Sequence, residues 1–465
     1  MKNNTILIFV IILLLLVPGC TKKRTKTLEE LPNIVLIIVD TLRADHLPFY
    51  GYKENTTPFL NKIAEKSTVF NRTFAASSWT APSTASIFTS LYPFQHKVLM
   101  NMLATITFNL INPDFSIKLN RIPQEIVTLG EVFKEKGYST FGFADNTNIG
   151  KKESFDQGFD TFVTFNYKKG ENLNRSIIEH SEEIKKSKRY FMYVHYMDPH
   201  QPNAEREAWF KTRTLKKVAN KNIKNRDNKE KIYNENLLYD SEINFTDSKI
   251  EELFKLFNWD KNTLFVFSAD HGEELWDHGR WGHGYSLYNE VIRVPLFFYY
   301  PGGNFKSGNI RQNVSTIDIL PTFREFIGLN SDSVNEGVSL LDLLENGEKK
   351  NVNGRYIYSH LVEKRMRQGK PALFESYGVI QDNMVYIRTL PGKKMRFKKL
   401  LFDINSDFGQ KKNLYESSGN EAEKLKAVYL KFRKSSKKFK QDISNYKSNK
   451  KEMEKLKTLG YIDGN

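Results

Sequence analysis

Cysteine is nearly absent from this sequence: Cys20 is the only one among 465 residues. The chain beyond residue 20 therefore has no disulfide, no cysteine ligand for a metal and no cysteine nucleophile. Acidic residues are fewer than basic ones, 54 against 70, which gives a formal net charge of +16. The excess is concentrated in residues 211–231 and in the tail from Lys424 onward. We predict that these tracts are solvated faces of a surface insertion and a C-terminal helix; the alternative is attraction to anionic lipid headgroups.

The longest hydrophobic run lies at the N-terminus. ILIFVIILLLLV ends at Pro18-Gly19-Cys20 and is followed by the basic stretch TKKRTK. The run is shorter than the ~20 residues that span a bilayer comfortably, which favours a signal peptide over an uncleaved transmembrane anchor. Because VPGC resembles a bacterial lipobox, we predict a signal peptide over residues 1–19 and a linker over residues 20–31 that begins at a lipidated Cys20. The protein is then exported and lipid-anchored to a membrane of the cell envelope, where no nucleic acid is expected as a partner.

Hydrophobic runs of strand length recur through the rest of the chain. They are continuous, which predicts strands buried on both faces, and they lie at residues 33–40, 139–145, 189–197, 263–270 and 293–301. Amphipathic stretches of helix length lie between them, at residues 58–66, 128–136, 175–186 and 239–257. This alternation predicts an α/β fold with a mostly parallel sheet between helices.

The length of the chain allows one large domain and a smaller appendage. We predict a catalytic domain over residues 32–350, in which the polar and basic stretch 203–231 is a long insertion. From about Gly354 the segments become shorter, which predicts a small antiparallel sheet followed by a lysine-rich helical tail. Residues 351–465 are assigned to this C-terminal subdomain.

Polar residues end several of the predicted strands, Asp40 and the pair Asp270-His271 most plainly. In open α/β sheets the ligand crevice lies beyond the carboxyl ends of the strands, so the chemistry is expected there. Thr80 lies in the segment SWTAPS, where a loop is predicted to turn into a helix. A hydroxyl held on a cation at a helix N-terminus loses proton affinity, which makes this threonine a candidate nucleophile. The alternative role for it is an ordinary N-cap.

Together these residues resemble the sulfatase family, a branch of the alkaline phosphatase superfamily. The likeness extends from about Leu31 to the end of the chain, in the order of the family's motifs. The matching segments are NIVLIIVDTLRADHL with YGY, PS with FTSLYP, HYMDPH, SADHGE, WGHG, VPL, DILPT, LFD with NL, and LGYI. The resemblance implies an alkaline-phosphatase-like α/β fold and a metal-dependent ester hydrolase or transferase.

The nucleophile segment departs from the family's pattern. Sulfatases carry Cys or Ser, a variable residue, Pro, a small residue and Arg, and the first residue is oxidised to formylglycine. Here these places hold Thr80, Ala81, Pro82, Ser83 and Thr84. Threonine is a secondary alcohol and cannot give that aldehyde. It is similar to the threonine of the superfamily's phosphodiesterases, lipoteichoic-acid synthases and phosphoethanolamine transferases, which is phosphorylated directly, so the resemblance favours phosphoester chemistry.

The resemblance implies one metal site formed by Asp40, Thr80, Asp270 and His271. Oxygen ligands with one imidazole suit Zn²⁺, Mn²⁺ or Ca²⁺. Thr41 stands where many sulfatases have a second aspartate ligand, which makes the site less suited to Ca²⁺.

Two further histidines, His200 and His283, correspond to the family's pair around the ester oxygens. With Asp198 they are alternatively the ligands of a second metal site. Structural roles are expected for His46, His195 and His278.

The predicted function is metal-dependent hydrolysis of an ester substrate through a covalent Thr80 ester, and the expected substrate class is an envelope glycan or lipid. His200 and His283 neutralise charge or donate a proton. Alternatives are a sulfuric ester hydrolase without formylglycine, a transferase of a phospho group, and a binding lipoprotein with a degenerate site.

Overall fold

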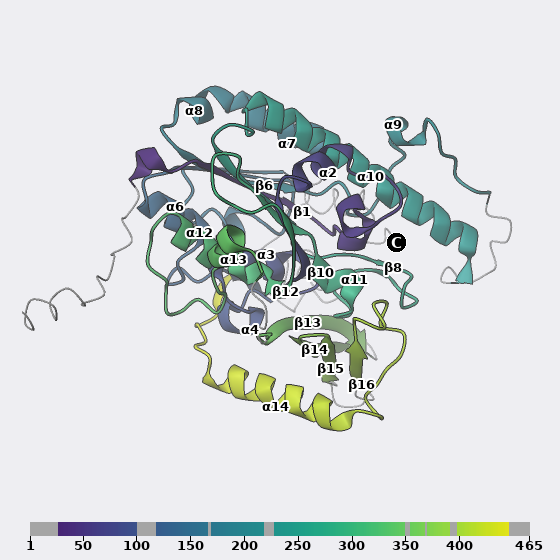
Figure 1. The fold of residues 1–465 in the computed structure, drawn as a ribbon. Coiled ribbons are helices and arrows are strands. Elements are labelled where there is room, and N and C mark those ends of the chain that lie inside the picture. The colour runs from purple at the N-terminus through teal and green to yellow at the C-terminus, as the bar shows by residue number, and fades with distance from the viewer. Residues whose placement is uncertain are drawn as a thin grey trace, which may run out of the picture.

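The computed structural model describes residues 27–99, 118–165, 169–217, 227–348, 354–367, 370–390 and 398–445. Figure 1 shows a large sheet between helices and, below it, a smaller sheet covered by a helix. The predicted signal peptide (residues 1–19) and Cys20 lie outside the described residues. Within the described ranges, no helix combines the length and the apolar character needed to cross a membrane.

Among the described residues, the large sheet has nine strands in the order β10-β2-β11-β7-β1-β6-β4-β5, with β12 paired to β2. Their bounds are β1 Asn33–Val39, β2 Thr68–Phe74, β4 Ser139–Ala144, β5 Thr161–Thr164, β6 Tyr190–Tyr196, β7 Thr263–Ala269, β10 Arg293–Val294, β11 Leu296–Tyr299 and β12 Gly308–Ser315. The five strands from β7 to β5 run parallel to one another. The predicted α/β class with a mostly parallel sheet is therefore confirmed.

The single strand predicted over residues 293–301 is wrong. The chain forms two short strands, β10 and β11, on either side of Pro295. Proline has no amide hydrogen to donate to a neighbouring strand, so it interrupts the ladder. β11 also runs antiparallel to both β7 and β2.

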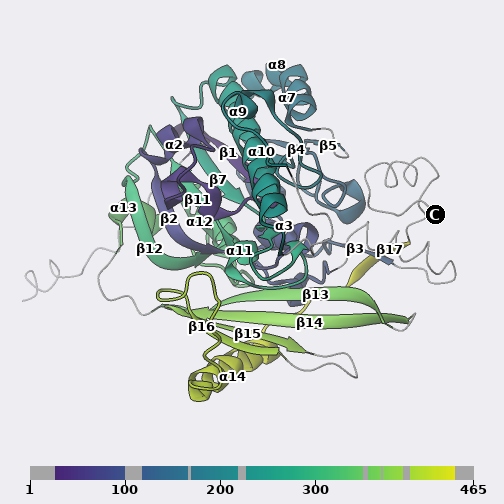
Figure 2. The same ribbon diagram turned by 90° about the vertical axis from the view of Figure 1, so that its right-hand side faces the viewer.

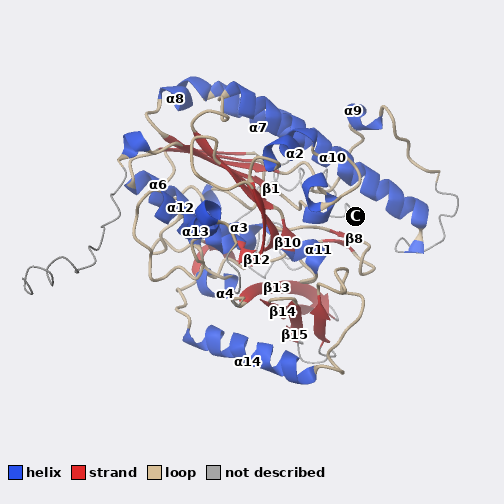
Figure 3. Ribbon diagram, in the orientation of Figure 1, coloured by secondary structure: helices blue, strands red, loops and turns tan. Residues whose placement is uncertain are grey.

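The large sheet is buried on both faces because successive side chains of a strand point to opposite sides. In β1, Ile34 and Leu36 belong to one hydrophobic core, and Val35 and Ile37 belong to the other. The helices that cover the first core are α3 Thr80–Thr89, α6 Leu129–Glu135, α12 Ile319–Phe326 and α13 Leu341–Asn346. Those that cover the second are α2 Pro58–Ala64, α7 Lys169–Glu179, α8 Ser181–Lys186 and α10 Lys229–Leu256. Figure 3 shows these helices on both sides of the strands.

Two predicted helices differ from those in the structure. The helix predicted over residues 175–186 is two helices, α7 and α8, and the one predicted over 239–257 begins ten residues earlier as α10. The first turns of α10 are polar, and they are stabilised by Asn228, whose side chain accepts a hydrogen bond from Lys231 N. Apolar periodicity alone does not reveal such turns.

The insertion predicted over residues 203–231 contains ordered elements. The short helix α9 (Glu207–Phe210) and the first turn of α10 lie inside it, and Trp209 of α9 is 3% exposed. Residues 218–226 lie outside the described ranges.

The small sheet contains β13 Ile357–Arg367, β14 Lys370–Gln381, β15 Met384–Leu390 and β16 Lys398–Asp403, all antiparallel. The helix α14 (Gly419–Ser435) packs beneath it, as Figure 2 shows, with the ring of Tyr429 stacked 4.0 Å from that of Tyr377. The predicted antiparallel sheet is confirmed, and the lysine-rich tail begins as a helix. Beyond α14, β17 (Asp442–Asn445) pairs with β3 (Lys118–Arg121), a contact that was not predicted.

Candidate active site

The candidate active site lies where adjacent parallel strands end. Asp40 follows β1, and Asp270 follows the neighbouring strand β7. On the other side of β1, His195 is the penultimate residue of β6, and Asn146 follows β4 by two positions. Because parallel strands bring their carboxyl ends to one edge of the sheet, these distant segments of the chain come together.

Asp40, Asp270 and His271 form a compact group that fits a divalent cation. All three are fully buried, and one ligand atom from each lies within 4.8 Å of the others. His271 Nε2 lies 3.6 Å from Asp40 Oδ1 and 3.6 Å from Asp270 Oδ2. Two of the carboxylate oxygens, Asp40 Oδ1 and Asp270 Oδ2, have no hydrogen-bond partner among the described residues. Buried carboxylate oxygens without partners are costly unless a cation neutralises them, so this donor set fits a bound metal.

Neighbouring hydrogen bonds determine which atoms face this group. His271 Nδ1 lies 2.8 Å from the carbonyl of Gly272, so Nδ1 carries the hydrogen and Nε2 presents its lone pair. Asp40 Oδ2 accepts a hydrogen bond from Asn146 Nδ2 at 2.6 Å and lies 3.5 Å from His195 Nε2. The second oxygen of Asp40, Oδ1, is thereby directed to the metal group.

Thr80 is the first residue of α3, and its hydroxyl reaches the same group. Oγ donates to Asp40 Oδ2 at 3.3 Å and lies 3.4 Å from His271 Nε2. The alternative role of Thr80 as an N-cap is wrong, because Trp79 occupies that position. The partial positive charge of the helix N-terminus therefore acts directly on the hydroxyl. The four residues predicted to form one metal site are brought together.

Burial and neighbouring charges shift the pKa values of this group. Burial, reinforced by the charge of Asp40, raises the pKa of Asp270 well above its usual range. Burial also acts to raise the pKa of Asp40, but the hydrogen bond from His195 and the adjacent histidines outweigh it and hold that pKa low. Burial and repulsion from His283 lower the pKa of His271 to about 3. His271 is therefore neutral, which is the state that coordinates a cation.

His283 and His200 continue from the metal group as a row of imidazole rings. The ring centroids of His271 and His283 are 4.5 Å apart, and those of His283 and His200 are 5.0 Å apart. His283 follows a hairpin of β8 (Glu274–Leu275) and β9 (Trp281–Gly282), and its Nδ1 lies 2.9 Å from Glu273 Oε1. Burial opposes the charged form of both rings. The Glu273 carboxylate nevertheless raises the pKa of His283, whereas the pKa of His200 is lowered.

Asp198, the alternative partner of these two histidines, is held by different groups. Its Oδ1 accepts a hydrogen bond from Gly170 N at 2.9 Å and another from Arg206 Nη2 at 3.3 Å. Within the described residues, the cluster of metal-ligating side chains does not include Asp198. The structure thus brings His200 and His283 together, while Asp198 belongs to a neighbouring network.

Two residues that contact Asp40 were not predicted as functional. His195, for which a structural role is predicted, lies against Asp40, and its Nδ1 is 2.8 Å from the hydroxyl of Tyr193. Asn146 stands outside every motif, and its only sequence signal is its place just after a strand; its Oδ1 accepts from Asn148 N at 2.8 Å. The other histidines predicted to be structural pair with carboxylates: His46 with Asp240, and His278 with Glu290.

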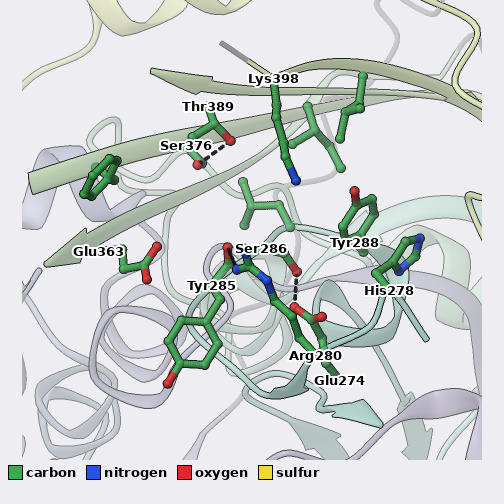
Figure 4. A pocket seen from close by; sticks show the side chains of 14 residues that line it. Glu274, His278, Arg280, Tyr285, Ser286, Tyr288, Glu363, Ser376, Thr389 and Lys398 are labelled. Carbon is green, nitrogen blue, oxygen red and sulfur yellow. Dashed lines mark hydrogen bonds between the residues drawn. The ribbon is translucent and has the colours of Figure 1, made fainter. Parts of the chain in front are cut away.

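A pocket of about 170 Å³ lies between the β8–β9 hairpin and the small sheet. Glu274 lines it and is fully buried; its Oε1 accepts from Ser286 Oγ at 2.7 Å, and its Oε2 has no partner among the described residues. Figure 4 shows Lys398 of β16 reaching into the pocket from the opposite side, with Arg280 next to Glu274. Groups of both charges therefore border the hairpin that precedes His283.

This fold, with an Asp-Asp-His group at the sheet edge and a hydroxyl at a helix start, is the arrangement expected of an ester hydrolase of the alkaline phosphatase type. The sulfatase family profile matches residues 32–329, and the profile "N-sulphoglucosamine sulphohydrolase, C-terminal" matches residues 276–438. The chain belongs to the sulfatase family, whose members are ester hydrolases of the alkaline phosphatase superfamily and are generally metal-dependent. The predicted family and enzyme class are confirmed.

Individual proteins resemble the chain over most of its length. An arylsulfatase of Clostridium perfringens is 26% identical over 456 residues, which cover 83% of this chain and 90% of that protein. The solved structure of a 2-O GAG sulfatase is 19% identical with a TM-score of 0.68, over 89% of this chain and 95% of that one. A phosphonate monoester hydrolase of Agrobacterium radiobacter is 17% identical with a TM-score of 0.65, over 87% and 95%.

Proposed function

We propose that the protein is a metal-dependent hydrolase of phosphate-type esters in which Thr80 forms the covalent intermediate. The observation that carries the proposal is the position of the Thr80 hydroxyl, 3.3 Å from Asp40 Oδ2 and 3.4 Å from His271 Nε2 at the start of α3. Threonine cannot become formylglycine, so in this proposal the hydroxyl itself attacks the ester. A phosphonate monoester hydrolase with the same fold is consistent with chemistry at phosphorus.

The metal would be held by Asp40, Asp270 and His271, with Thr80 beside it. When bound, a divalent cation lowers the pKa of a hydroxyl and neutralises the charge on ester oxygens. The N-terminus of α3 acts in the same direction, because its partial positive charge favours the ionised oxygen. Both effects prepare Thr80 Oγ as the nucleophile.

With its proton lost to solvent, Thr80 Oγ is the ionised nucleophile. In the first step it forms a bond to phosphorus as the bond from phosphorus to the leaving oxygen breaks. His283 is oriented by Glu273 through Nδ1, at 2.9 Å, and gives a proton from Nε2 to the leaving oxygen. In the second step, water attacks phosphorus, its proton passes to the neutral His283, and the bond to Thr80 Oγ breaks. His200 borders the ester beside His283. A monoester substrate yields phosphate and a diester yields a phosphate monoester, while Thr80 Oγ returns to its ionised form and His283 is protonated again.

The test is an assay of the full chain on aryl phosphate monoesters, aryl phosphate diesters and an aryl sulfate, after chelation and metal add-back. Thr80→Ala is expected to abolish phosphoester turnover, whereas Thr80→Ser keeps the hydroxyl and retains part of it. Thr89→Ala is the matched control, because Thr89 lies in the same helix and its Oγ donates to the carbonyl of Ala85, at 2.7 Å, away from the candidate metal group. Unchanged turnover in Thr80→Ala would refute the proposal.

Faster turnover of the aryl sulfate would favour the alternative, a sulfuric ester hydrolase that uses threonine. The sulfatase names of the relatives support this second candidate. Mass spectrometry of rapidly quenched enzyme tests either reaction, since the peptide that contains Thr80 is expected to carry the transferred group.

The leader sequence supports a proposed location for this reaction. VPGC at the end of an apolar run supports lipidation of Cys20 and attachment to a membrane of the cell envelope. An envelope glycan or lipid would then be the ester substrate within reach of the anchored enzyme.

A further inference from the structure

The loop that carries His200 is held against α10 by a buried ion-pair network centred on Arg206. We infer that Arg206 is a positioning residue that holds His200 in the arrangement the reaction requires. This inference rests on the proposed function, in which His200 borders the ester. It assigns Arg206 no contact with the substrate or the metal.

Arg206 joins the two ends of the His200 loop. Its Nη2 donates to Asp198 Oδ1 at 3.3 Å, and its Nε donates to Glu242 Oε2 on α10 at 2.6 Å. Asp198 precedes His200 by two residues and Arg206 follows it by six. The Asp198–Arg206 ion pair therefore links the chain before His200 to the chain after it. The guanidinium also lies 3.7 Å from the ring centroid of Phe245, one turn further along α10.

Glu242 holds the loop at a second point. Its Oε1 accepts from the backbone N of Ala204 at 2.8 Å, and the adjacent Ser241 Oγ donates to the Ala204 carbonyl at 2.8 Å. The side chains of Asp198 and Glu242 are 0% and 2% exposed, and that of Arg206 is 14% exposed. Burying two carboxylates costs free energy of desolvation unless a cation pairs with them. Arg206 therefore determines whether both carboxylates can remain in place.

The helix α10 supports the other half of the site as well. The hydroxyl of Tyr239 on α10 donates to the carbonyl of Thr41 at 2.6 Å, directly after Asp40 in the chain. Arg206 ties the His200 loop to the same helix only one turn away, at Glu242. The position of His200 relative to Asp40 and the metal group thus depends on how firmly the loop is held to α10.

Arginine suits this position better than lysine. Its planar fork donates to two carboxylates at once while its face stacks on Phe245, whereas a lysine ammonium is a single point charge. Arg206→Lys is therefore expected to keep the fold but restore only part of the activity, and Arg206→Met to remove the charge while retaining the packing of the side-chain stem.

The experiment compares Arg206→Met and Arg206→Lys with a matched control, Arg213→Met. Arg213 follows the same loop, stacks 3.7 Å above the ring of Trp209, and pairs with Glu54 at 2.8 Å, but has no contact with the Asp198–Glu242 network among the described residues. For each full-length variant we would measure kcat and KM on the aryl ester, metal content, thermal stability, and amide hydrogen exchange over residues 197–206. Arg206→Met is expected to lower kcat roughly 10- to 100-fold with little change in KM.

The accompanying readouts separate positioning from general damage. In Arg206→Met, metal content is expected to stay at the wild-type level and amide hydrogen exchange over residues 197–206 to become faster. The activity of Arg206→Lys is expected to lie between that of the wild type and that of Arg206→Met. Equal kcat in Arg206→Met and Arg213→Met would overturn the inference, as would a loss that only follows the unfolded fraction. If Thr80→Ala and His200→Ala are inactive while Arg206→Met matches its control, the inference alone fails. Full activity of Thr80→Ala would instead overturn the proposed function.

Discussion

Replacing Asn146 by alanine is expected to weaken metal binding about 10- to 100-fold. Asn146 Nδ2 donates to Asp40 Oδ2 at 2.6 Å, and its Oδ1 accepts from Asn148 N at 2.8 Å, which fixes the orientation of the amide. Without this amide, Asp40 Oδ2 keeps the hydroxyl of Thr80 at 3.3 Å and the ring nitrogen of His195 at 3.5 Å. The shortest hydrogen bond that orients the carboxylate is lost.

The magnitude follows from the type of bond. A hydrogen bond from an amide to a buried carboxylate contributes about 1.5–3 kcal/mol, which corresponds to roughly 10- to 100-fold in a binding constant. The effect reaches the metal because rotation of the carboxylate moves Asp40 Oδ1 away from its place 3.6 Å from His271 Nε2.

The assay is calorimetric titration of chelated protein with the metal that restores activity. Asn174→Ala is the matched control: Asn174 is equally buried and donates to Glu252 Oε2 at 2.9 Å, but it lies in α7 and has no part in the metal group. Both variants are expected to lose stability, and only Asn146→Ala to lose metal affinity. Wild-type metal affinity in Asn146→Ala would refute the reasoning.

Four other perturbations test separate parts of the molecule. Glu153→Gln is expected to stabilise the protein by about 1–3 kcal/mol near pH 8 and to have no effect near pH 4. Burial raises the pKa of Glu153 from 4.5 to about 7, so the folded state binds the proton more tightly and stability falls as the pH rises through this window; equal effects at both pH values in denaturant titrations would contradict this. Glu273→Gln is expected to move the alkaline limb of the kcat/KM profile to lower pH, because burial lowers the pKa of His283 and the Glu273 carboxylate raises it; an unmoved limb would exclude His283 as the acid. Chelation is expected to lower Tm, and metal add-back to restore it in calorimetric scans. Cys20→Ser is expected to release the protein from the membrane fraction, and its retention there would contradict lipid anchoring.

The central strands could be predicted because their burial leaves a local signal. A strand buried on both faces, such as β1, is apolar at every position, and the structure agrees with the prediction within a residue or two. Contacts between distant segments leave no such signal. The polar first turns of α10 and the pairing of β17 with β3 depend on tertiary context, so neither was predicted.

The residues of the candidate metal group were predicted from motifs, whereas the residues that support them were not. Asp40 and Asp270 directly follow strands and stand in recognisable segments, which locates them at the sheet edge. Asn146 also follows a strand, but no residue pattern distinguishes it from an ordinary loop asparagine. Asp198 also follows a strand, and it was predicted as an alternative metal ligand. In the structure, however, its carboxylate faces Gly170 and Arg206.

The order of the strands explains how the Asp40 carboxylate can face the candidate metal group with one oxygen and accept hydrogen bonds with the other. β1 lies between β7 and β6, with β4 beyond β6, so Asp40 has the other candidate metal ligands on one side and hydrogen-bond donors on the other. Asn146 and His195 occupy the side toward Oδ2, while Asp270 and His271 lie on the side toward Oδ1. Substitutions on the β4 and β6 side therefore act on metal affinity through the rotation of Asp40, without any contact with the metal. Because the Thr80 hydroxyl also donates to Oδ2, the same rotation displaces the proposed nucleophile, so metal affinity and turnover are expected to fall together in these variants.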